Sequence, residues 1–343
     1  MVRESCSGPN GSAPLGRSST RLRRVGGHRP CAGVVIFTLS LAGCATHRVV
    51  ASAGTELAAH SMASYRDEPD YELARVSGYA NVKLMEALLR SDPENAELML
   101  GLAQGFAGVA FAFAEEDLDR LRCSAPGAVA NERRRLAALY RRGQAYAAAA
   151  LEADHARAAD VLAGSPFALR RYLAGFRGPD LSGLFWYAFN ALGAAGAGDD
   201  EVETAFELGR VRVIAERLVE LDAAYAHGGP LLLLGIIDAS LPEHLSVVAD
   251  RGASSFERAR ALNDGRFLLA HVEWARTYAV TTRDRDGFDA ALADVLSAPP
   301  DILPEERLIT TVAKRRARSL IGRSESLFSP PTTSDGEQQI PCS

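Results

Sequence analysis

Hydrophobic and polar positions repeat with a helical period along nearly the whole chain from Asp67 onward. One face of the segment that follows Asp200 carries aliphatic side chains every three or four positions: Val211, Ile214, Leu218 and Leu221. Asp200 is a good N-cap for that helix, and Glu203 stands where a capping box places its acid. Runs of β-branched residues are scarce, and no convincing strand pattern is present. The pattern therefore predicts an all-α domain over residues 67–328.

The segment from Glu94 to Ala114 is apolar on nearly every side and contains Gly101, Gly105 and Gly108. A glycine inside a helix costs about 1 kcal/mol relative to alanine, so three of them indicate that a second helix approaches closely. We predict a central buried helix here. The alternative is that these small residues leave room for a ligand channel.

Internal repetition predicts how the helices are arranged. Leu88 to Asp92 resembles Leu218 to Asp222, and the pair Phe256 and Ala259 recurs 32 residues later as Phe288 and Ala291. This spacing is close to the repeat of about 34 residues in tetratricopeptide proteins, which stack helix pairs and bury a continuous core between neighbours. We expect stacked antiparallel helix pairs in a compact tetratricopeptide-like α-solenoid, with a central pore as a further expectation.

The first 43 residues have the pattern of a secretion signal. A basic stretch precedes an apolar run from Cys31 to Gly43 that is too short to span a bilayer. The run ends in Leu41-Ala42-Gly43-Cys44, and the segment resembles a bacterial lipoprotein signal. The resemblance implies that residues 1–43 are removed and that the Cys44 sulfur carries a diacylglycerol. The alternative is an uncleaved anchor.

A lipoprotein signal would place the protein on the periplasmic side of a membrane. Residues 44–66 then form an acylated tether, and Ala45 after the acylated cysteine favours the outer membrane. The tail, residues 329–343, is rich in Pro, Ser, Thr and Gln and is predicted to be disordered.

The net charge limits which molecules the protein can bind, and the cysteine content limits which disulfides it can form. The chain has 38 Lys and Arg against 43 Asp and Glu, and residues 1–43 hold six Arg and one acid, so the mature net charge is −10. Nucleic acid is an unsuitable partner for such an acidic chain, because phosphate backbones are bound by basic patches. After processing, only Cys123 and Cys342 remain free to pair, and their pairing stays open.

An aromatic patch is the best candidate for ligand contact. Its members are Phe185, Trp186, Tyr187, Phe189 and Asn190, which lie on a glycine-rich predicted helix. Large rigid aromatic side chains suit an apolar ligand or the lining of a pore, and packing in the core is the alternative.

Three further features have two interpretations each. Trp274 and Tyr278 share a helical face and are predicted to pack in the core, with contact to an apolar ligand as the alternative. His271 is expected to be a hydrogen-bonded core histidine, with a role as a ligand as the alternative. The basic stretch of Lys314, Arg315, Arg316 and Arg318 is predicted to be a solvated face, with docking of an acidic partner as the alternative.

Motifs of catalysis are missing from the sequence. It has no His-Glu-x-x-His pair, no Gly-x-Ser-x-Gly elbow and no phosphate-binding loop. The seven histidines are scattered without metal-ligand spacing. We therefore expect no catalytic residue, no metal and no cofactor.

An ordered set of short motifs resembles the T-component family of TRAP transporters, which are lipoproteins with degenerate tetratricopeptide helices. The stretches that carry the resemblance are Tyr65-Arg66-Asp67-Glu68-Pro69-Asp70, Asp92-Pro93-Glu94-Asn95, Leu184-Phe185-Trp186-Tyr187-Ala188, Leu221-Asp222-Ala223-Ala224-Tyr225, Phe256-Glu257-Arg258-Ala259, His271-Val272-Glu273-Trp274-Ala275, Ala317-Arg318 and Leu327-Phe328. They span residues 65–328 in the expected order.

The resemblance implies a non-enzymatic accessory protein that assembles as a homotrimer, with an apolar pore through each subunit. It also implies a periplasmic TRAP-type solute-binding protein as the partner, and a hydrophobic or organic-acid ligand. The competing hypothesis is a general tetratricopeptide scaffold lipoprotein that serves in envelope assembly.

Overall fold

The structure is a computed structural model that describes residues 62–240 and 246–329. The predicted signal peptide, Cys44, most of the tether, Cys342 and nearly all of the predicted tail lie outside the described residues. The expectations that concern them therefore stay predictions.

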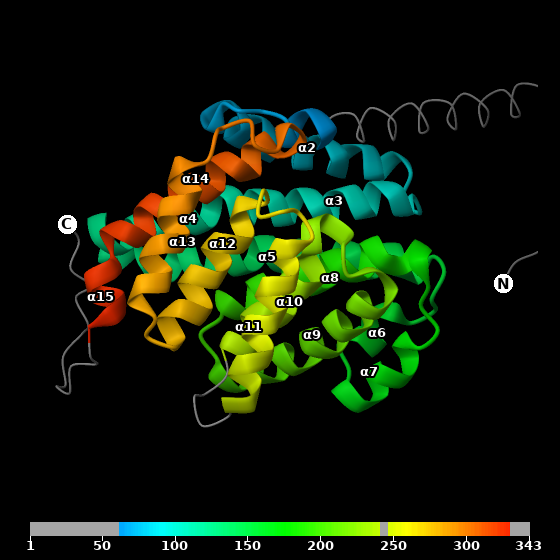
Figure 1. Cartoon of the computed structure of the whole chain (residues 1–343). Helices are drawn as coiled ribbons and strands as arrows, with labels where there is room; N and C mark the ends of the chain where they lie inside the picture. Colours follow the sequence, from blue (N-terminus) through cyan, green and yellow to red (C-terminus); the bar gives the residue numbers. More distant parts are fainter. Residues whose placement is uncertain (1–61, 241–245, 330–343) are drawn as a thin grey trace, which may run out of the picture. The chain divides into compact units, whose positions relative to one another are not determined.

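The expected all-α fold is confirmed, because the described residues form helices and contain no strand (Figure 1). The α-helices are α2 (Tyr71–Ser91), α3 (Ala96–Val109), α4 (Glu115–Ser124), α5 (Val129–Glu152), α6 (Ala158–Leu162), α7 (Pro166–Leu173), α8 (Leu181–Gly196), α9 (Glu201–Asp222), α10 (Tyr225–Ala239), α11 (Ser246–Ala261), α12 (Leu268–Trp274), α13 (Arg285–Ser297), α14 (Arg307–Gly322) and α15 (Ser324–Phe328). The 3-10 turns are η2 (Pro126–Ala128), η3 (Gly178–Asp180) and η5 (Pro304–Glu306), and the π-helical segments are η1 (Ala110–Ala114) and η4 (Ala275–Ala279).

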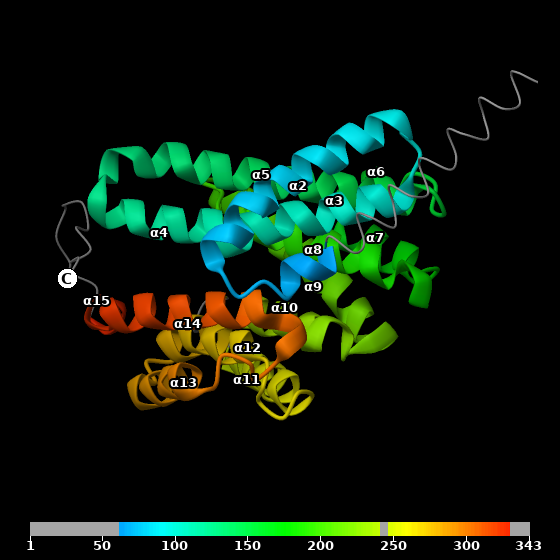
Figure 2. The same ribbon diagram turned by 90° about the horizontal axis from the view of Figure 1, so that it is seen from above.

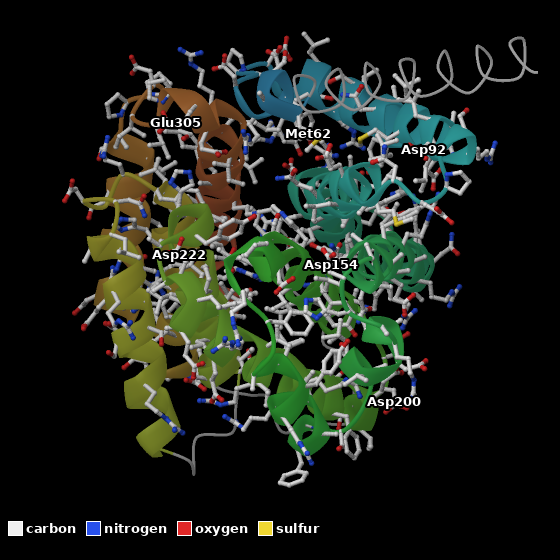
Figure 3. The ribbon with its side chains drawn as sticks, turned by 90° about the vertical axis from the view of Figure 1, so that its right-hand side faces the viewer. Met62, Asp92, Asp154, Asp200, Asp222 and Glu305 are labelled. Atoms are coloured by element: carbon white, nitrogen blue, oxygen red, sulfur yellow. The ribbon has the colours of Figure 1, made fainter. Side chains whose placement is uncertain are left out.

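Helices that follow one another along the chain pack side by side. α2 packs on α3, α3 on α5, α5 on α8, α8 on α9, α9 on α10 and α10 on α11. Helices α2 to α5 lie on one side, and α10 to α14 lie on the other (Figure 2). Figure 3 shows the same two sides from one end of the domain, with Asp92 and Asp154 on the first side and Asp222 and Glu305 on the second.

The two sides meet again through α14. This helix packs against α2, and three basic side chains of α14 and its C-cap pair with acids of α4. The return contact closes the packed helices into a ring.

The predicted central helix is confirmed, and it is longer than the sequence indicated. α3, η1 and α4 form one continuous helix, whose residues Phe106 and Phe113 are completely or almost completely buried. The stretch Ala96–Arg122 is long and apolar enough to cross a membrane, and 61% of its most apolar window is buried inside the protein. Burial of this extent is typical of the core helix of a globular protein.

Capping decides where two of these helices begin. The Asp200 carboxylate accepts hydrogen bonds from the backbone N–H groups of Val202 and Glu203, so the predicted N-cap of α9 is confirmed. The N-cap of α3 is Asn95, which accepts from the N–H of Leu98. Asp92 is the C-cap of α2, and its carboxylate accepts a hydrogen bond from the Asn95 side chain.

Glycines bring α5 and α8 into close contact. A Cβ atom added at Gly193 of α8 would lie 2.5 Å from the Tyr140 ring of α5, and one at Gly183 would lie 2.6 Å from another α5 side chain. A Cβ added at Gly143 of α5 would overlap the Asn190 amide. These three positions have no room for a larger residue, and they seat α8 tightly against α5.

Candidate ligand-binding cavity

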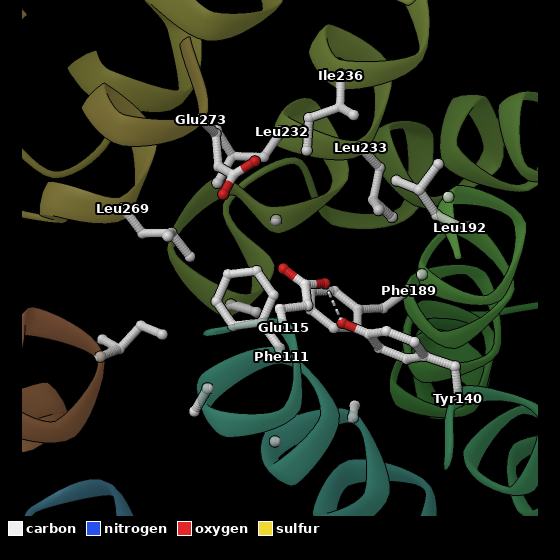
Figure 4. A pocket seen from close by; sticks show the side chains of 18 of the residues that line it. Phe111, Glu115, Tyr140, Phe189, Leu192, Leu232, Leu233, Ile236, Leu269 and Glu273 are labelled. Carbon is white, nitrogen blue, oxygen red and sulfur yellow. Dashed lines mark hydrogen bonds between the residues drawn. The ribbon is translucent and has the colours of Figure 1, made fainter. Parts of the chain in front are cut away.

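The ring of helices encloses a cavity of about 760 Å³. Side chains line it from the α3–η1–α4 helix, α5, α8, α9, α10, α12, η4 and the start of α14. Figure 4 shows that several of them point into one space, among them Leu192, Leu232, Leu233, Ile236 and Leu269. A cavity of this size is within the range of small-molecule sites, and its lining is mainly apolar.

The cavity is elongated along the central helix. Its lining on that helix recurs every three or four residues from Gln104 to Arg122, a stretch of about 27 Å at 1.5 Å per residue. The lining reaches exposed residues at both ends. Arg66 is exposed at the end near Gln104, and Gly196 and Ser240 are exposed at the end near Arg122.

Three of the predicted aromatic residues form one wall of the cavity. The rings of Phe185 and Trp186 lie 5.0 Å apart, and Phe189 lies 5.6 Å from Trp186. Phe189 also meets Phe111 of η1 at 5.6 Å, and Phe185 meets Tyr225 of α10 at 5.2 Å. The patch thus connects α8 to the central helix and to α10, and its binding role remains a prediction.

The other two predicted residues, Tyr187 and Asn190, do not belong to the cavity lining. Tyr187 is 3% exposed and lies beside Gln144 of α5 and Arg210 of α9. Asn190 is fully buried and donates hydrogen bonds to the carbonyls of Ala103 and Trp186, at 3.1 and 2.8 Å. Both side chains leave α8 on its packed face. At 3.6 residues per turn, Tyr187 points nearly opposite to the lining residues of α8, and Asn190 lies roughly a quarter of a turn from them.

Charged residues meet at the centre of the cavity, and the sequence pattern does not single them out for this site. The Tyr140 hydroxyl donates to Oε1 of Glu115 at 2.5 Å. Arg316 of α14 donates to Oε2 of Glu115 at 2.8 Å and to the carbonyl of Phe111 at 2.5 Å. Its guanidinium also stacks over the Phe111 ring, 3.8 Å from the centroid. These contacts hold Arg316 in place through its Nη2 group and one face of its guanidinium.

A second ion pair lies on the opposite wall. Glu273 of α12 is 2% exposed, and its Oε2 accepts from Nε of Arg276 at 2.5 Å. The other Glu273 oxygen has no hydrogen bond and lies 3.7 Å from Arg316. Figure 4 shows Glu273 and Glu115 entering the cavity from opposite sides. Burial lowers the pKa of Arg276, but the carboxylates of Glu273 and Glu115 outweigh it and hold that pKa above its ordinary value.

Both π-helical segments lie at this polar centre. Glu115 directly follows η1, Glu273 comes two residues before η4, and Arg276 lies within η4. A π-helical turn widens the helix and changes the direction of the side chains, and such turns are rare and often mark functional positions. Helical periodicity in the sequence contains no signal for them, which is one reason that these residues were missed.

A strained turn forms the end of the cavity near Arg66. Ala226, His227 and Gly228 have φ angles of 47°, 59° and 85°, so three consecutive residues are left-handed where α10 begins. Left-handed conformations cost non-glycine residues of order 1 to 3 kcal/mol each, so the surrounding contacts must hold the turn. Pro230 begins the regular part of the helix, where its missing N–H costs nothing.

His227 is fixed at this end by contacts on every side. Its ring stacks on Phe267 at 4.8 Å, Nδ1 donates to Asn263 at 3.1 Å, and Nε2 lies 3.5 Å from Glu306. The hydrogen bond to Glu306 raises the pKa of His227 above its usual value. Arg66 lies 4.0 Å from the same carboxylate.

The remaining predicted side chains serve the core. Trp274 and Tyr278 are partly buried against it, with ring centroids 5.9 Å apart, and the rings lie outside the cavity lining. Nε2 of His271 donates to the Gly265 carbonyl at 3.1 Å, so the hydrogen-bonded core histidine is confirmed. Burial lowers the pKa of His271.

The predicted solvated face of α14 is wrong for its central arginines. Arg315 forms two hydrogen bonds with Glu116, and Arg316 enters the cavity cluster. Lys314 donates to the carbonyls of Leu296 and Ala298. A cluster of basic residues in the sequence suggests an exposed helix face. In the structure, these cations instead bind groups of neighbouring helices.

In the described part of the chain, no group of three or more His, Cys, Asp or Glu residues is placed to hold a metal ion. The polar centre of the cavity consists of arginine and carboxylate groups paired with one another. Ser240 of the lining donates to the carbonyl of Ile236 in its own helix. The combination of apolar walls with a charged centre suits an amphipathic molecule.

The described residues thus define an all-α protein with a largely apolar cavity. The chain matches the family model of the TRAP transporter T-component over residues 67–328, and it belongs to this family. An uncharacterized protein of Treponema pallidum (strain Nichols) is 24% identical over 323 residues, which cover 88% of this chain and 98% of that protein.

Family membership makes the protein an accessory component of a TRAP transport system, associated with a membrane on the periplasmic side. The T-component is a transport component and is not known as an enzyme.

Proposed function

We propose that the protein is a membrane-anchored periplasmic accessory component that binds a TRAP-type solute-binding protein and helps to pass a hydrophobic or organic-acid ligand. The cavity is the observation that carries this proposal. It has about 760 Å³, mostly apolar walls, and lining residues over about 27 Å of the central helix.

The geometry supports passage of the ligand along the cavity. The lining reaches exposed side chains near both ends of the central helix, which a route between two openings requires. The helix pairs that stack along the chain and close through α14 fit a tetratricopeptide-like solenoid with its pore inside the ring. In the proposed arrangement, the protein is anchored in the outer membrane through lipid on Cys44 and assembles as a homotrimer.

Affinity purification of the cross-linked, acylated protein from its own envelope tests the partner. Mass spectrometry should identify a TRAP-type solute-binding protein that co-purifies with the wild-type chain. A Cys44→Ala variant should fold but no longer associate with the membrane. Recovery of only cell-wall or envelope-assembly proteins would contradict the transport role and favour the scaffold.

A further inference from the structure

One arginine of the cavity lining, Arg276, is held by a hydrogen bond on one edge of its guanidinium. Nε of Arg276 donates to Glu273 at 2.5 Å, and no hydrogen bond joins its two terminal amino groups to any residue that the structure describes. The side chain belongs to the cavity lining, and 36% of its surface is accessible to solvent. The guanidinium therefore presents its free end, with four N–H bonds, to the cavity.

Protein surrounds that free end, although it is accessible. A cation that loses part of its hydration without gaining enough partners is destabilised, which is why desolvation alone would lower the pKa of Arg276. The end of a guanidinium is a planar fork, and it matches the two oxygens of a carboxylate. Glu273 occupies the other edge and fixes the direction of the fork.

The other arginine of the cluster cannot serve a ligand in the same way. Arg316 does not belong to the cavity lining, and its side chain is only 14% exposed. Its Nη2 donates to Glu115 and to the Phe111 carbonyl, and its face is covered by the Phe111 ring. Of these two arginines, only Arg276 lines the cavity, and no described residue accepts a hydrogen bond from its terminal amino groups. Two carboxylates, Glu273 and Glu115, act on Arg276 and would repel a second negative charge beside the fork. A second charge farther along the ligand would lose its hydration against the apolar walls.

The rest of the cavity is suited to an apolar chain. Phe111, Phe189, Leu232 and Leu269 surround the space beside Glu273 and Glu115 (Figure 4). From the level of Glu115 to Gln104 the lining follows about 16 Å of helix, and aromatic and aliphatic side chains predominate there.

We propose that Arg276 binds the carboxylate of an amphipathic ligand with a single negative charge, whose apolar chain lies along the aromatic wall. This inference rests on the proposed function of the cavity, and it selects long-chain monocarboxylates over dicarboxylates and over neutral apolar molecules. Glu273 is a positioning residue, because it orients the fork without contacting the ligand.

Isothermal titration with three probes of equal chain length tests the inference on the wild-type protein: dodecanoate, dodecan-1-ol and dodecanedioate. The titration is made at about pH 8, where carboxylic acids are ionised. Dodecanoate should bind at least about tenfold more tightly than dodecan-1-ol, since a fork to carboxylate contact is a charge-assisted pair in a site of low dielectric constant. It should also bind at least about tenfold more tightly than dodecanedioate, whose second carboxylate would lose its hydration against the apolar walls. Equal affinity for dodecanoate and dodecan-1-ol would overturn the role of Arg276, while leaving the apolar cavity as a binding site. Tighter binding of dodecanedioate would overturn the selection for a single charge.

Substitutions test whether Arg276 causes the preference for dodecanoate over dodecan-1-ol. The double variant Arg276→Gln with Glu273→Gln removes the pair together, so that no buried charge is left alone, and it should bind dodecanoate and dodecan-1-ol equally. Arg276→Lys keeps the charge without the fork and should retain part of the preference. Arg260→Gln is the matched control, because Arg260 stacks on Trp274 outside the cavity and its loss should leave the preference intact.

Circular dichroism and thermal melts establish that each variant folds. If the double variant keeps the wild-type preference, Arg276 is not the carboxylate site. If none of the three probes binds the wild-type protein, the inference is overturned, and recovery of a solute-binding protein in the cross-linking experiment still decides the proposed function independently.

Discussion

The two faces of α8 show how one helix can serve the core and the cavity. On one face, Gly183, Asn190 and Gly193 pack so tightly on α5 that an added Cβ atom at either glycine would come within 2.6 Å of a neighbour. On the other face, the large rings of Trp186 and Phe189 stand together beside open space.

Small residues of α8 shape the cavity indirectly. Gly183 lies outside the lining and lets α8 approach α5, while Gly193 borders the cavity and also meets the Tyr140 ring. This close approach fixes the position of α8, and the position of the helix fixes the direction of its aromatic side chains.

The glycines of the central helix divide in a similar way. A Cβ at Gly105 would lie 2.8 Å from Val82 of α2, so this glycine allows the close approach of a second helix that the sequence predicts. Gly108 lines the cavity, whereas Gly101 and Gly105 do not, so the channel alternative concerns one position of the three.

The packed face and the open face should respond differently when a leucine of α8 is changed to tryptophan. Leu184 is completely buried in the packed core, and Leu184→Trp should lower the free energy of unfolding by about 3 kcal/mol or more through overpacking. Leu192 lines the cavity, so Leu192→Trp should change that free energy by less than about 1 kcal/mol. Urea denaturation measures both values.

The Leu192→Trp variant should also fill the binding space. Fluorescence titration with the neutral apolar dye N-phenyl-1-naphthylamine should show at least about tenfold weaker binding than to the wild-type protein. Equal destabilisation by the two substitutions would mean that the faces do not differ, and unchanged dye binding would place the dye elsewhere.

The tight contact between α5 and α8 predicts a somewhat smaller loss. Gly143→Ala should displace the Asn190 amide and weaken its hydrogen bonds to Ala103 and Trp186, which lowers the free energy of unfolding by about 2 to 3 kcal/mol. Thermal and urea unfolding provide the measurement.

Two further variants test whether the clash of the added methyl group with the Asn190 amide causes the loss of stability. Gly196→Ala lies on α8 with no atom within 4 Å of the added Cβ, and it should be neutral or stabilising by up to about 1 kcal/mol. Combining Gly143→Ala with Asn190→Ala should cost less than the sum of the two single changes, because the overlap is gone. Full additivity would show that the clash is not the cause.

A change of pH should have a modest effect at the strained end of the cavity. The pKa of His227 is raised in the folded state, so its contribution is complete below its unfolded value near 6.5 and is lost as the pH rises through the folded value. The stability difference between wild type and His227→Gln should therefore shrink by under about 1 kcal/mol from about pH 6 to about pH 8.

His271 offers the matched comparison with opposite sign. Burial lowers its pKa, so its contribution is lost as the pH falls below about 6.5, and the difference between wild type and His271→Gln should shrink toward acid pH. Chemical unfolding across this pH range measures both. Slopes of the same sign would contradict the assigned environments.

The aromatic patch shows how far local pattern reaches into the site. Five neighbouring residues on one helix were the candidates, and the structure turns Phe185, Trp186 and Phe189 to the cavity but Tyr187 and Asn190 to the packed face. Helical geometry separates the two sets, but which set faces open space depends on where α5 and the central helix lie. For this reason, Tyr187→Arg would bury a charge in the core and would not test the cavity.

Local pattern was sufficient to predict the all-α fold, the buried central helix, the N-cap at Asp200 and the family, because helical period, capping and ordered motifs are properties of short stretches of chain. The polar centre of the cavity required the tertiary structure. Glu115, Tyr140, Glu273 and Arg276 line the cavity, and Arg316 pairs with Glu115 from α14. These residues come from four separate stretches, and they meet because α14 returns to α4 and α12 packs on α14, with a π-helical turn next to Glu115 and another at Arg276. Charges so far apart in the sequence look like surface residues until the ring closes and removes them from bulk water.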